Sequence, residues 1–221
     1  MVEKSQLLSA EYRLRFEKME QYRNGVWKIL CSRFFSQYIP EESAVLDLGA
    51  GWGEFINNVK ANSKFAMDLN ADTKEHLNDG ITLIHQDCSE PWQLDSESLD
   101  VVFTSNFLEH LPNKERVDHT IAEAYRCLKK GGRIICLGPN IKYVNGAYWD
   151  FWDHYIPLTD ASVEELLKLA GFNVRENIPR FLPYSMSNEK NPPLFTVSLY
   201  LKMPFIWPLL GKQFLVVAEK I

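Results

Sequence analysis

The sequence predicts an α/β fold built around a largely parallel sheet. Apolar segments of strand length begin at residue 44 and recur at 64–67, 81–85, 99–105 and 132–137, and helical patterns separate most of them. Alternation of this kind is typical of parallel strands covered by helices, with ligands bound at the carboxyl ends of the strands. With 221 residues the chain is long enough for one well-buried domain of this class and too short for two. We therefore expect a single domain over residues 1–221.

Residues 1–40 are expected to form a helical cap. Apolar and aromatic side chains recur there at spacings of three and four, which describes one stripe of a helix. The pattern favours two helices that are broken near Asn24 and Gly25, and most of the stripe is expected to pack on the sheet. The stripe consists of Tyr12, Phe16, Met19, Tyr22, Val26, Trp27, Leu30 and Phe34.

A glycine-rich turn follows the first predicted strand. Gly49, Gly51 and Gly53 are spaced two apart after Asp47, and a helix is predicted over 53–60. Glycines at such a turn let a ligand approach the backbone, which indicates a site for a small-molecule cofactor. A dinucleotide fingerprint would need a small residue at the sixth position, where this chain has Glu54. Its long acidic side chain would obstruct helix packing and repel a pyrophosphate.

Polar residues also follow the next three predicted strands. Asp68 ends the second strand nineteen residues after Gly49, the distance at which a carboxylate can accept hydrogen bonds from ribose hydroxyls. The third strand ends at Gln86, Asp87 and Cys88, and the fourth leads into residues 106–111, Asn-Phe-Leu-Glu-His-Leu.

This ordered set over residues 44–139 resembles the motifs of class I S-adenosylmethionine (SAM)-dependent methyltransferases of the small-molecule type. The resemblance implies a Rossmann-like sheet of seven strands, mostly parallel with an antiparallel last strand, and helices on both faces. It implies SAM as the cofactor and residues 44–139 as the SAM-binding core. The leading helices often cover the cofactor in this family, so Tyr12, Arg15, Tyr22 and Arg23 are further candidates. The residues expected to bind SAM are Asp47, Leu48, Gly49, Ala50, Gly51, Gly53, Asp68, Leu69, Asp87, Cys88, Asn106 and Phe107.

The remaining elements follow from capping and periodicity. A helix is predicted over 113–130, with Lys129 and Lys130 at its C-terminus and the next two glycines as its cap. Thr159 and Asp160 are expected to cap a helix that runs to residue 169. Strands are predicted over 172–181 and 213–220, and the family resemblance places the latter strand between the fifth and sixth.

Two insertions, residues 140–158 and 182–211, are expected on the substrate side. The first carries an aromatic cluster in which Asp150 or Asp153 could orient His154 as a general base. His110 is a second catalytic candidate, although its frequency in the family also suggests a supporting role. Trp149, Trp152 and Tyr155 suit stacking on a sugar, and a planar aromatic acceptor or a hydrophobic plug over the sheet edge is also consistent with them.

Residues 191–211 are almost uncharged but interrupted by Pro204 and Pro208, so they do not fit a transmembrane helix. A cap over the pocket, a dimer contact and a segment that meets a lipid-linked substrate all remain open. Residues 204–220 also resemble the C-terminal part of bacterial methyltransferases that accompany glycosyltransferases in cell-surface polysaccharide clusters. The resemblance favours O-methylation of a sugar or glycan precursor, with a lipid-like or aromatic acceptor and a non-catalytic SAM-binding module as the alternatives.

Composition excludes several other classes. A net charge of −5 gives no basic footprint for nucleic acid. The four cysteines have no CxxC spacing, so neither a zinc site nor a disulfide framework is expected, and no metal is predicted. The first twenty residues mix acids and bases without an apolar core, which argues against a secretory signal and favours the cytoplasm. The oligomeric state and the acceptor atom stay open.

Overall fold

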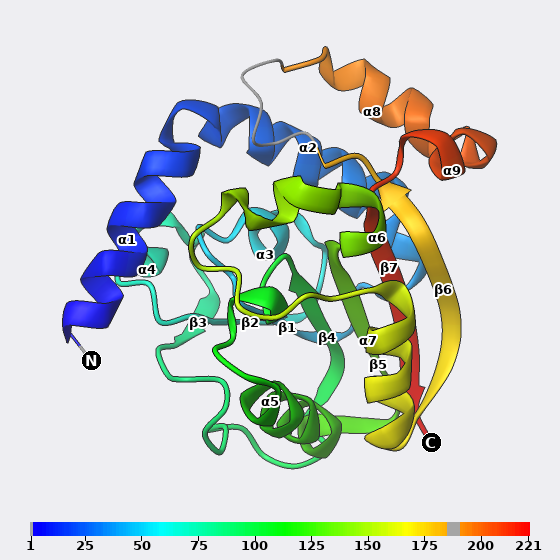
Figure 1. Ribbon diagram of the computed structural model, residues 1–221. Helices are drawn as coiled ribbons and strands as arrows, with labels where there is room; N and C mark the ends of the chain where they lie inside the picture. Colours follow the sequence, from blue (N-terminus) through cyan, green and yellow to red (C-terminus); the bar gives the residue numbers. More distant parts are fainter. Residues whose placement is uncertain (1, 185–190) are drawn as a thin grey trace. The chain divides into compact units, whose positions relative to one another are not determined.

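The computed structural model describes residues 2–184 and 191–221 and contains a seven-stranded sheet in the order β3-β2-β1-β4-β5-β7-β6 (Figure 1). The fold class predicted from the sequence is confirmed, including an antiparallel last strand between the fifth and sixth. The described chain divides into two compact units. The first holds residues up to 87 together with 191–203, and the second holds 88–184 together with 204–221. That residues 1–221 form a single domain stays a prediction.

The first unit contains three parallel strands, and a short helix follows each of the first two. Strand β1 (Ala44–Leu48) pairs with β2 (Ser63–Met67), and β2 pairs with β3 (Ile81–Ile84). Helices α3 (Glu54–Asn58) and α4 (Thr73–His76) follow β1 and β2. Val45, Leu46 and Leu48 are completely buried, as expected for a parallel strand covered on both faces.

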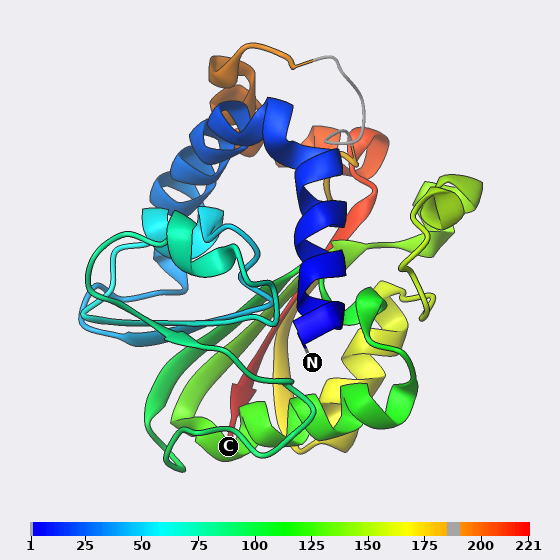
Figure 2. The ribbon, with the colours of Figure 1, turned by 90° about the vertical axis from the view of Figure 1, so that its left-hand side faces the viewer.

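The N-terminal helices break earlier than the sequence predicts. Helix α1 (Val2–Phe16) ends at a 3-10 turn, η1 (Glu17–Met19), and α2 (Glu20–Arg33) then runs through Asn24 and Gly25 without interruption. The predicted break was therefore wrong, because this glycine serves packing and not a turn. A Cβ atom on Gly25 would lie 2.7 Å from Leu194 of α8 (Leu194–Leu201), the helix that runs along α2 (Figures 1 and 2).

The second unit contains the other four strands. Strand β4 (Leu99–Ser105) is parallel to β5 (Leu128–Pro139). Strand β7 (Gln213–Lys220) lies between β5 and β6 (Phe172–Leu182) and is antiparallel to both. The sequence analysis predicts β4 and β7 with these same limits, because each is a mainly apolar segment of strand length.

Helix α5 (Lys114–Cys127) begins at the predicted cap, since the Asn113 side chain accepts the Arg116 N–H at 3.0 Å. It ends three residues before the predicted limit, so placing Lys129 and Lys130 in its last turn was wrong. Leu128 is completely buried, has extended backbone and pairs with Leu99 as the first residue of β5. Burial of this leucine in the sheet therefore overrides the helix-ending signal of the following lysines and glycines.

Helix α7 (Asp160–Leu169) packs on β6 and β7 (Figure 1). The shorter helical segments are η2 (Phe35–Gln37), η3 (Leu108–His110), α6 (Ile141–Val144), η4 (Asn145–Asp150), η5 (Pro204–Ile206) and α9 (Trp207–Leu210). Among the residues described, no helix has the length and apolar character needed to cross a bilayer.

Thr159 is expected to stabilise α7 through a capping box. Its hydroxyl accepts the Ser162 N–H at 3.0 Å, and the Ser162 hydroxyl accepts the Thr159 N–H at 2.9 Å. Thr159→Ala should lower the free energy of unfolding by about 1 kcal/mol, because one helical N–H loses its acceptor. Urea denaturation measures this loss. Thr159→Ser keeps the hydroxyl and is the control, so equal losses in both variants would contradict the capping role.

Candidate cofactor and acceptor site

The turn between β1 and α3 depends on glycine. Gly49, Gly51 and Gly53 have φ angles of 75°, 54° and 73°, a left-handed region that other residues adopt at a cost. The Gly49 N–H donates to the Met67 carbonyl at 2.9 Å, which ties the turn to the end of β2. A Cβ on Gly51 would collide with the Tyr12 ring, so absence of a side chain matters here for space as well.

Asp68 holds this turn from the end of β2. One carboxylate oxygen accepts the Gly51 N–H at 2.7 Å, and the other accepts the Asn70 N–H at 2.7 Å. Burial raises the pKa of this carboxyl, and the backbone donors oppose the rise. Because each carboxylate oxygen has two lone pairs, the side chain keeps acceptor capacity for a ligand. Leu69 is the next residue, and its carbonyl lies 3.1 Å from His85 Nε2.

Asp47 is the most deeply placed acid of the turn, with 3% of its surface exposed. Burial raises the pKa of this carboxyl well above its usual range, and the carboxylates of Glu54 and Asp68 raise it further. The backbone N–H of Ile56 opposes the rise. Leu48 and Ala50, the neighbours predicted with it, are also buried.

The structure pairs Glu54 with Arg23, a contact that the sequence analysis does not predict. Arg23 Nε lies 2.7 Å from a Glu54 carboxylate oxygen, and both residues are buried. Arg23 also donates to the Tyr12 hydroxyl at 3.0 Å and lies over the Phe16 ring. Glu54 therefore occupies the position where a dinucleotide site needs a small residue, but its charge is compensated. The steric argument against a pyrophosphate holds, and the argument from repulsion is weaker than the sequence suggests.

Helix α1 contacts both the glycine turn and the segment that follows β2. Ser9 donates to the Asn70 side chain at 2.6 Å, and Arg13 forms an ion pair with Asp72 at 2.6 Å. The Tyr12 ring packs against Trp52. Of the four helical candidates, Tyr12 and Arg23 thus border the turn, whereas Arg15 and Tyr22 are half-buried elsewhere on α1 and α2.

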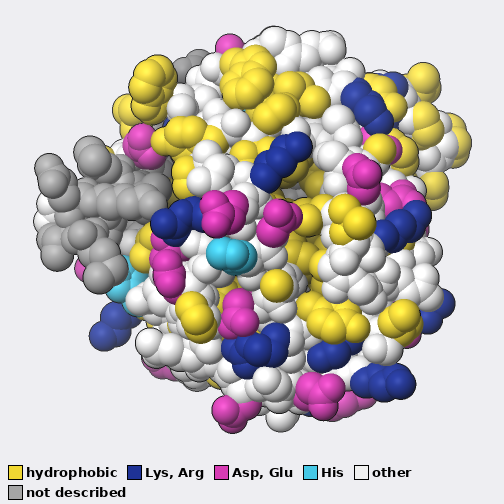
Figure 3. Space-filling model, turned by 60° about the horizontal axis from the view of Figure 1, so that its bottom comes forward, with side chains coloured by type: hydrophobic (Ala, Val, Ile, Leu, Met, Phe, Trp, Pro, Cys, Tyr) yellow, Lys and Arg dark blue, Asp and Glu magenta, His cyan; other side chains and the backbone are white. Residues whose placement is uncertain are grey.

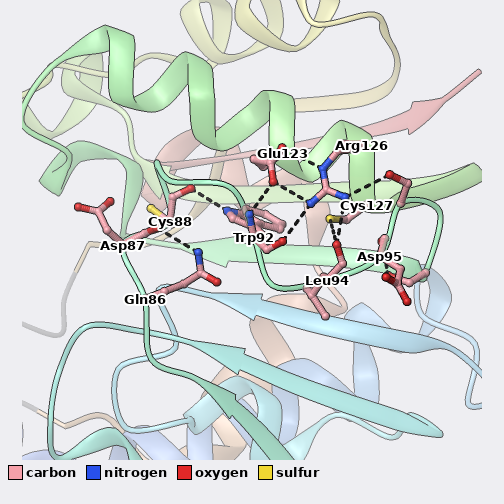
Figure 4. A network of polar contacts seen from close by, with 11 residues as sticks. Gln86, Asp87, Cys88, Trp92, Leu94, Asp95, Glu123, Arg126 and Cys127 are labelled. Atoms are coloured by element: carbon pink, nitrogen blue, oxygen red, sulfur yellow. Dashed lines mark hydrogen bonds and ion pairs between the residues drawn. The ribbon is translucent and has the colours of Figure 1, made fainter.

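The segment after β3 carries the predicted adenine contacts, Asp87 and Cys88, and is fastened to α5 (Figure 4). The buried Cys88 contributes its carbonyl to Trp92 Nε1 at 2.7 Å. Glu123 accepts the Trp92 N–H at 2.6 Å, and Arg126 binds the Trp92 and Leu94 carbonyls as well as Glu123. This network fixes the course of the chain that follows Cys88.

Asn106 and Phe107 follow β4. Asn106 has a φ of 49°, and its N–H donates to the Leu137 carbonyl at 2.9 Å. A non-glycine residue held in this conformation at a strand end is typical of functional sites. The exposed Asn106 side chain donates to the Ser105 hydroxyl, and Phe107 is half-buried.

Two predicted catalytic histidines lie together in the second unit. The rings of His110 and His154 are 4.8 Å apart. His110 Nδ1 lies 3.1 Å from the Asp153 carboxylate and 3.0 Å from the Asp153 carbonyl, whereas His154 Nδ1 donates to the Tyr148 carbonyl at 2.6 Å. Burial lowers the pKa of His110, but Asp153 and the Glu109 carboxylate together outweigh this effect, so the pKa is raised. The sequence analysis predicts that Asp153 could orient His154, whereas the structure shows Asp153 in contact with His110.

Glu109 belongs to the same cluster, and the sequence analysis does not select it. Only 1% of its surface is exposed, and burial raises the pKa of its carboxyl. Its backbone carbonyl accepts the N–H groups of Tyr155 and Ile156 at 2.9 and 3.3 Å, so it joins the aromatic segment to the end of β4. The signal available in the sequence is an acid next to His110 after a buried strand.

The aromatic residues of this segment divide into two groups. Tyr148 is completely buried and donates to the Ile156 carbonyl, so it anchors the segment. The three predicted substrate residues, Trp149, Trp152 and Tyr155, are 53%, 88% and 54% exposed. The hydrophobic-plug interpretation therefore applies to Tyr148, and these three rings face solvent.

Comparison with known families assigns the class of the protein. Residues 46–136, which contain the glycine turn and the segment after β4, match the model of a methyltransferase domain. The chain therefore contains a methyltransferase domain of class I. Enzymes of this class use SAM as the methyl donor, so SAM is the cofactor. A search of curated proteins finds no match.

Solved structures show the same fold. A chain from Thermotoga maritima, described as a SAM-dependent methyltransferase and possible histamine N-methyltransferase, is similar with a TM-score of 0.71 and 15% identity. The alignment covers 97% of this chain and 99% of that one. A SAM-dependent methyltransferase from Archaeoglobus fulgidus gives 0.68 and 20%, with 93% and 99% covered. A Haloferax volcanii chain, in complex with the Trm112 methyltransferase activator, gives 0.67 and 18%, with 96% of each chain covered.

Asp47 is expected to reduce the stability of the methyltransferase. The pKa of its carboxyl is higher in the folded protein than in the unfolded chain. Stability is therefore lost as the pH rises from the unfolded-state pKa towards the folded-state pKa. Asp47→Asn should therefore raise the free energy of unfolding at pH 7 by on the order of 1–3 kcal/mol. The gain should disappear well below pH 4, at about pH 3, where the carboxyl is protonated in the unfolded chain as well. Urea denaturation at both pH values measures it, and an equal difference at both would refute the assignment.

Proposed function

We propose that this methyltransferase transfers a methyl group from SAM to a hydroxyl group of a sugar or glycan precursor. The observation that carries the proposal is the combination, within residues 148–155, of three exposed rings with Asp153 and His154, which both lie against His110. Exposed rings can stack on the apolar faces of a sugar, and the polar cluster can bind and activate a hydroxyl.

Conformation and charge at the glycine turn support the assignment of SAM contacts. Asp68 combines a fixed position with remaining acceptor capacity, which suits the two ribose hydroxyls. Asp47 offers negative charge to the methionine end of the donor, whose ammonium and sulfonium groups are cations. Gly49, Gly51 and Gly53 leave the backbone accessible, with Leu48, Ala50 and Leu69 beside them. From their own segments, Asp87 and Cys88 are assigned to the adenine, and Asn106 and Phe107 to the surroundings of the methyl group.

SAM supplies an electrophilic methyl group, so the protein must position the acceptor and remove its proton. We assign the activation of the acceptor hydroxyl to His154 and His110, with Asp153 as the group that orients His110. In both rings Nδ1 faces an oxygen, so the neutral imidazole carries its lone pair on Nε2. That nitrogen is the candidate acceptor of the hydroxyl proton.

A lipid-like or aromatic acceptor is the second candidate. Helix α8 exposes Leu194, Phe195 and Leu199, and residues 205, 209 and 210 in the second unit are exposed apolar side chains as well. An apolar acceptor or a lipid-linked sugar would suit such surfaces. Capping, dimerisation and contact with a lipid surface all remain candidate roles for residues 191–211.

A nucleic-acid substrate is a poor fit. On the face drawn in Figure 3, Lys and Arg side chains alternate with Asp and Glu side chains, which is the distribution expected for a net charge of −5. We therefore retain a small molecule or glycan as the proposed partner and the cytoplasm as the proposed location.

Asp68→Asn should weaken SAM binding at least tenfold. The amide oxygen can still accept the Gly51 N–H, but the charge and one acceptor for the ribose are lost. Isothermal titration calorimetry with SAM measures the change. Asp79→Asn, at an exposed position in the same unit, is the matched control and should bind as the wild type does. Equal affinity in the wild type and Asp68→Asn would remove Asp68 from the site.

His154→Ala should lower turnover at least tenfold while SAM affinity stays nearly unchanged, because the activating group is lost and the donor contacts are kept. Turnover requires an acceptor, so a panel of nucleotide sugars and simple glycosides is assayed for S-adenosylhomocysteine release. His119→Ala, at an exposed position on α5, is the control. Wild-type turnover in His154→Ala would exclude His154 from activation of the acceptor.

A further inference from the structure

Glu109, His110 and His154 form a cluster whose chemistry exceeds what proton transfer needs. One oxygen or nitrogen ligand atom from each of them lies within 4.8 Å of the other two. Glu109 and His154 are buried, and His110 is half-buried. Two N–H groups donated to the Glu109 carbonyl from Tyr155 and Ile156 hold the two contributing segments together. The cluster is therefore built into the fold and does not result from flexible surface side chains.

Both imidazoles are oriented from behind by oxygen acceptors. His154 Nδ1 lies 2.6 Å from the Tyr148 carbonyl, which can only accept, so this nitrogen carries the proton and the lone pair is on Nε2. His110 Nδ1 faces the carbonyl and the carboxylate of Asp153 at 3.0 and 3.1 Å. A histidine that binds a metal almost always donates its other N–H to a carbonyl or carboxylate in this way.

Glu109 supplies the second, independent observation. Its Oε1 atom is buried and has no hydrogen-bond partner among the residues that the structure describes. A buried carboxylate oxygen without a partner is costly, and such groups in native structures normally face a donor or a cation. Glu109 is also adjacent in sequence to His110, whose Nδ1 faces Asp153 and whose lone pair is therefore on Nε2.

A single bridging proton would satisfy only two of these three groups. One carboxylate and two imidazole nitrogens converge, whereas a proton links one donor to one acceptor. A metal ion accepts all three at once and leaves further coordination positions for water or substrate. The three ligand atoms must then move closer together, since two ligand atoms on one ion at about 2.1 Å are separated by at most about 4.2 Å.

We propose that Glu109, His110 and His154 bind one divalent first-row transition-metal ion. Two neutral imidazoles with one carboxylate favour zinc, manganese, iron or cobalt over magnesium and calcium, which prefer oxygen ligands. Asp153 and the Tyr148 carbonyl position the two histidines and do not touch the ion. The sequence analysis predicts no metal because it considers cysteine spacing, whereas this ligand set joins residues 44 positions apart in the chain, from His110 to His154.

Such an ion would lower the pKa of an acceptor hydroxyl and hold it in position. This role rests on the proposed function, but metal binding by the isolated protein does not. In this arrangement the Nε2 atom of His154 binds the ion and does not accept the proton itself. The hydroxyl proton is then transferred to solvent. Loss of either histidine then removes the ion as well as the imidazole.

Metal titration of the chelator-treated full chain tests the inference. Equilibrium dialysis against ZnCl₂ and MnCl₂, with MgCl₂ in parallel, followed by elemental analysis, should give one transition-metal ion per chain. Glu109→Gln, His110→Ala and His154→Ala should each weaken binding at least a hundredfold, and Asp153→Asn by about tenfold through the orientation of His110. His119→Ala should bind as the wild type does.

Glu109→Gln and His110→Gln keep the size of the side chains, and circular dichroism checks their folding, so loss of binding in them cannot be ascribed to unfolding. Absence of a stoichiometric ion in the wild type, or equal affinity in the wild type and both of these variants, would overturn the inference. SAM titration of the same samples separates it from the proposed function. SAM binding without metal binding would contradict only the proposed metal site. Failure to bind SAM would contradict the proposed SAM contacts.

Discussion

The hydrogen bond from the Gly51 N–H to Asp68 is the interaction on which the cofactor side of this methyltransferase depends. It joins the turn after β1 to the end of β2 while the turn is in a left-handed conformation that only glycine adopts easily. The Tyr12 ring occupies the space that a side chain at position 51 would fill, and Arg23 holds Tyr12 from behind. A long side chain on Gly51 would therefore disturb the turn, the helix that covers it and the carboxylate below it together.

Acidic groups gather at this turn at an electrostatic cost. Burial raises the pKa values of both Asp47 and Asp68, which means that their charged forms are disfavoured in the protein alone. At the proposed site, a ligand that carries an ammonium and a sulfonium group would offset this cost, whereas an anionic dinucleotide would increase it. Arg23 compensates the charge of Glu54 and does not contact the other two acids in the same way. The charge distribution therefore supports the proposed cationic donor more strongly than the glycine spacing does.

The parts of the fold that the sequence predicts well are those where local pattern and burial agree. Strands β1, β4 and β7 are mainly apolar segments of strand length, and Thr159 caps α7 with its side chain as its residue type predicts. Prediction fails where a residue distant in the sequence determines the local structure. The sequence predicts a helix break at Gly25, but this glycine makes room for Leu194. Helix α5 ends before Leu128 because Leu128 pairs with Leu99.

The same limit applies to the candidate site. Asp68 and the glycines are found from spacing, since each lies at the end of a predicted strand. Glu109 is missed because its significance depends on His154, 45 positions later, and on a lone buried oxygen that no sequence pattern reports. The pairing of Asp153 with His110 likewise depends on the path of the insertion.

The aromatic segment of residues 148–155 is held by contacts that do not involve its exposed rings. The aromatic segment is fixed at two points, the buried Tyr148 ring and the Glu109 carbonyl that accepts two backbone N–H groups. Neither point uses the exposed Trp149, Trp152 or Tyr155 side chains. Substitution of those rings should therefore leave the histidine cluster in place. The glycine turn lies in one compact unit and the aromatic segment in the other, whereas the proposed donor contacts Cys88, Asn106 and Phe107 share the unit of the aromatic segment.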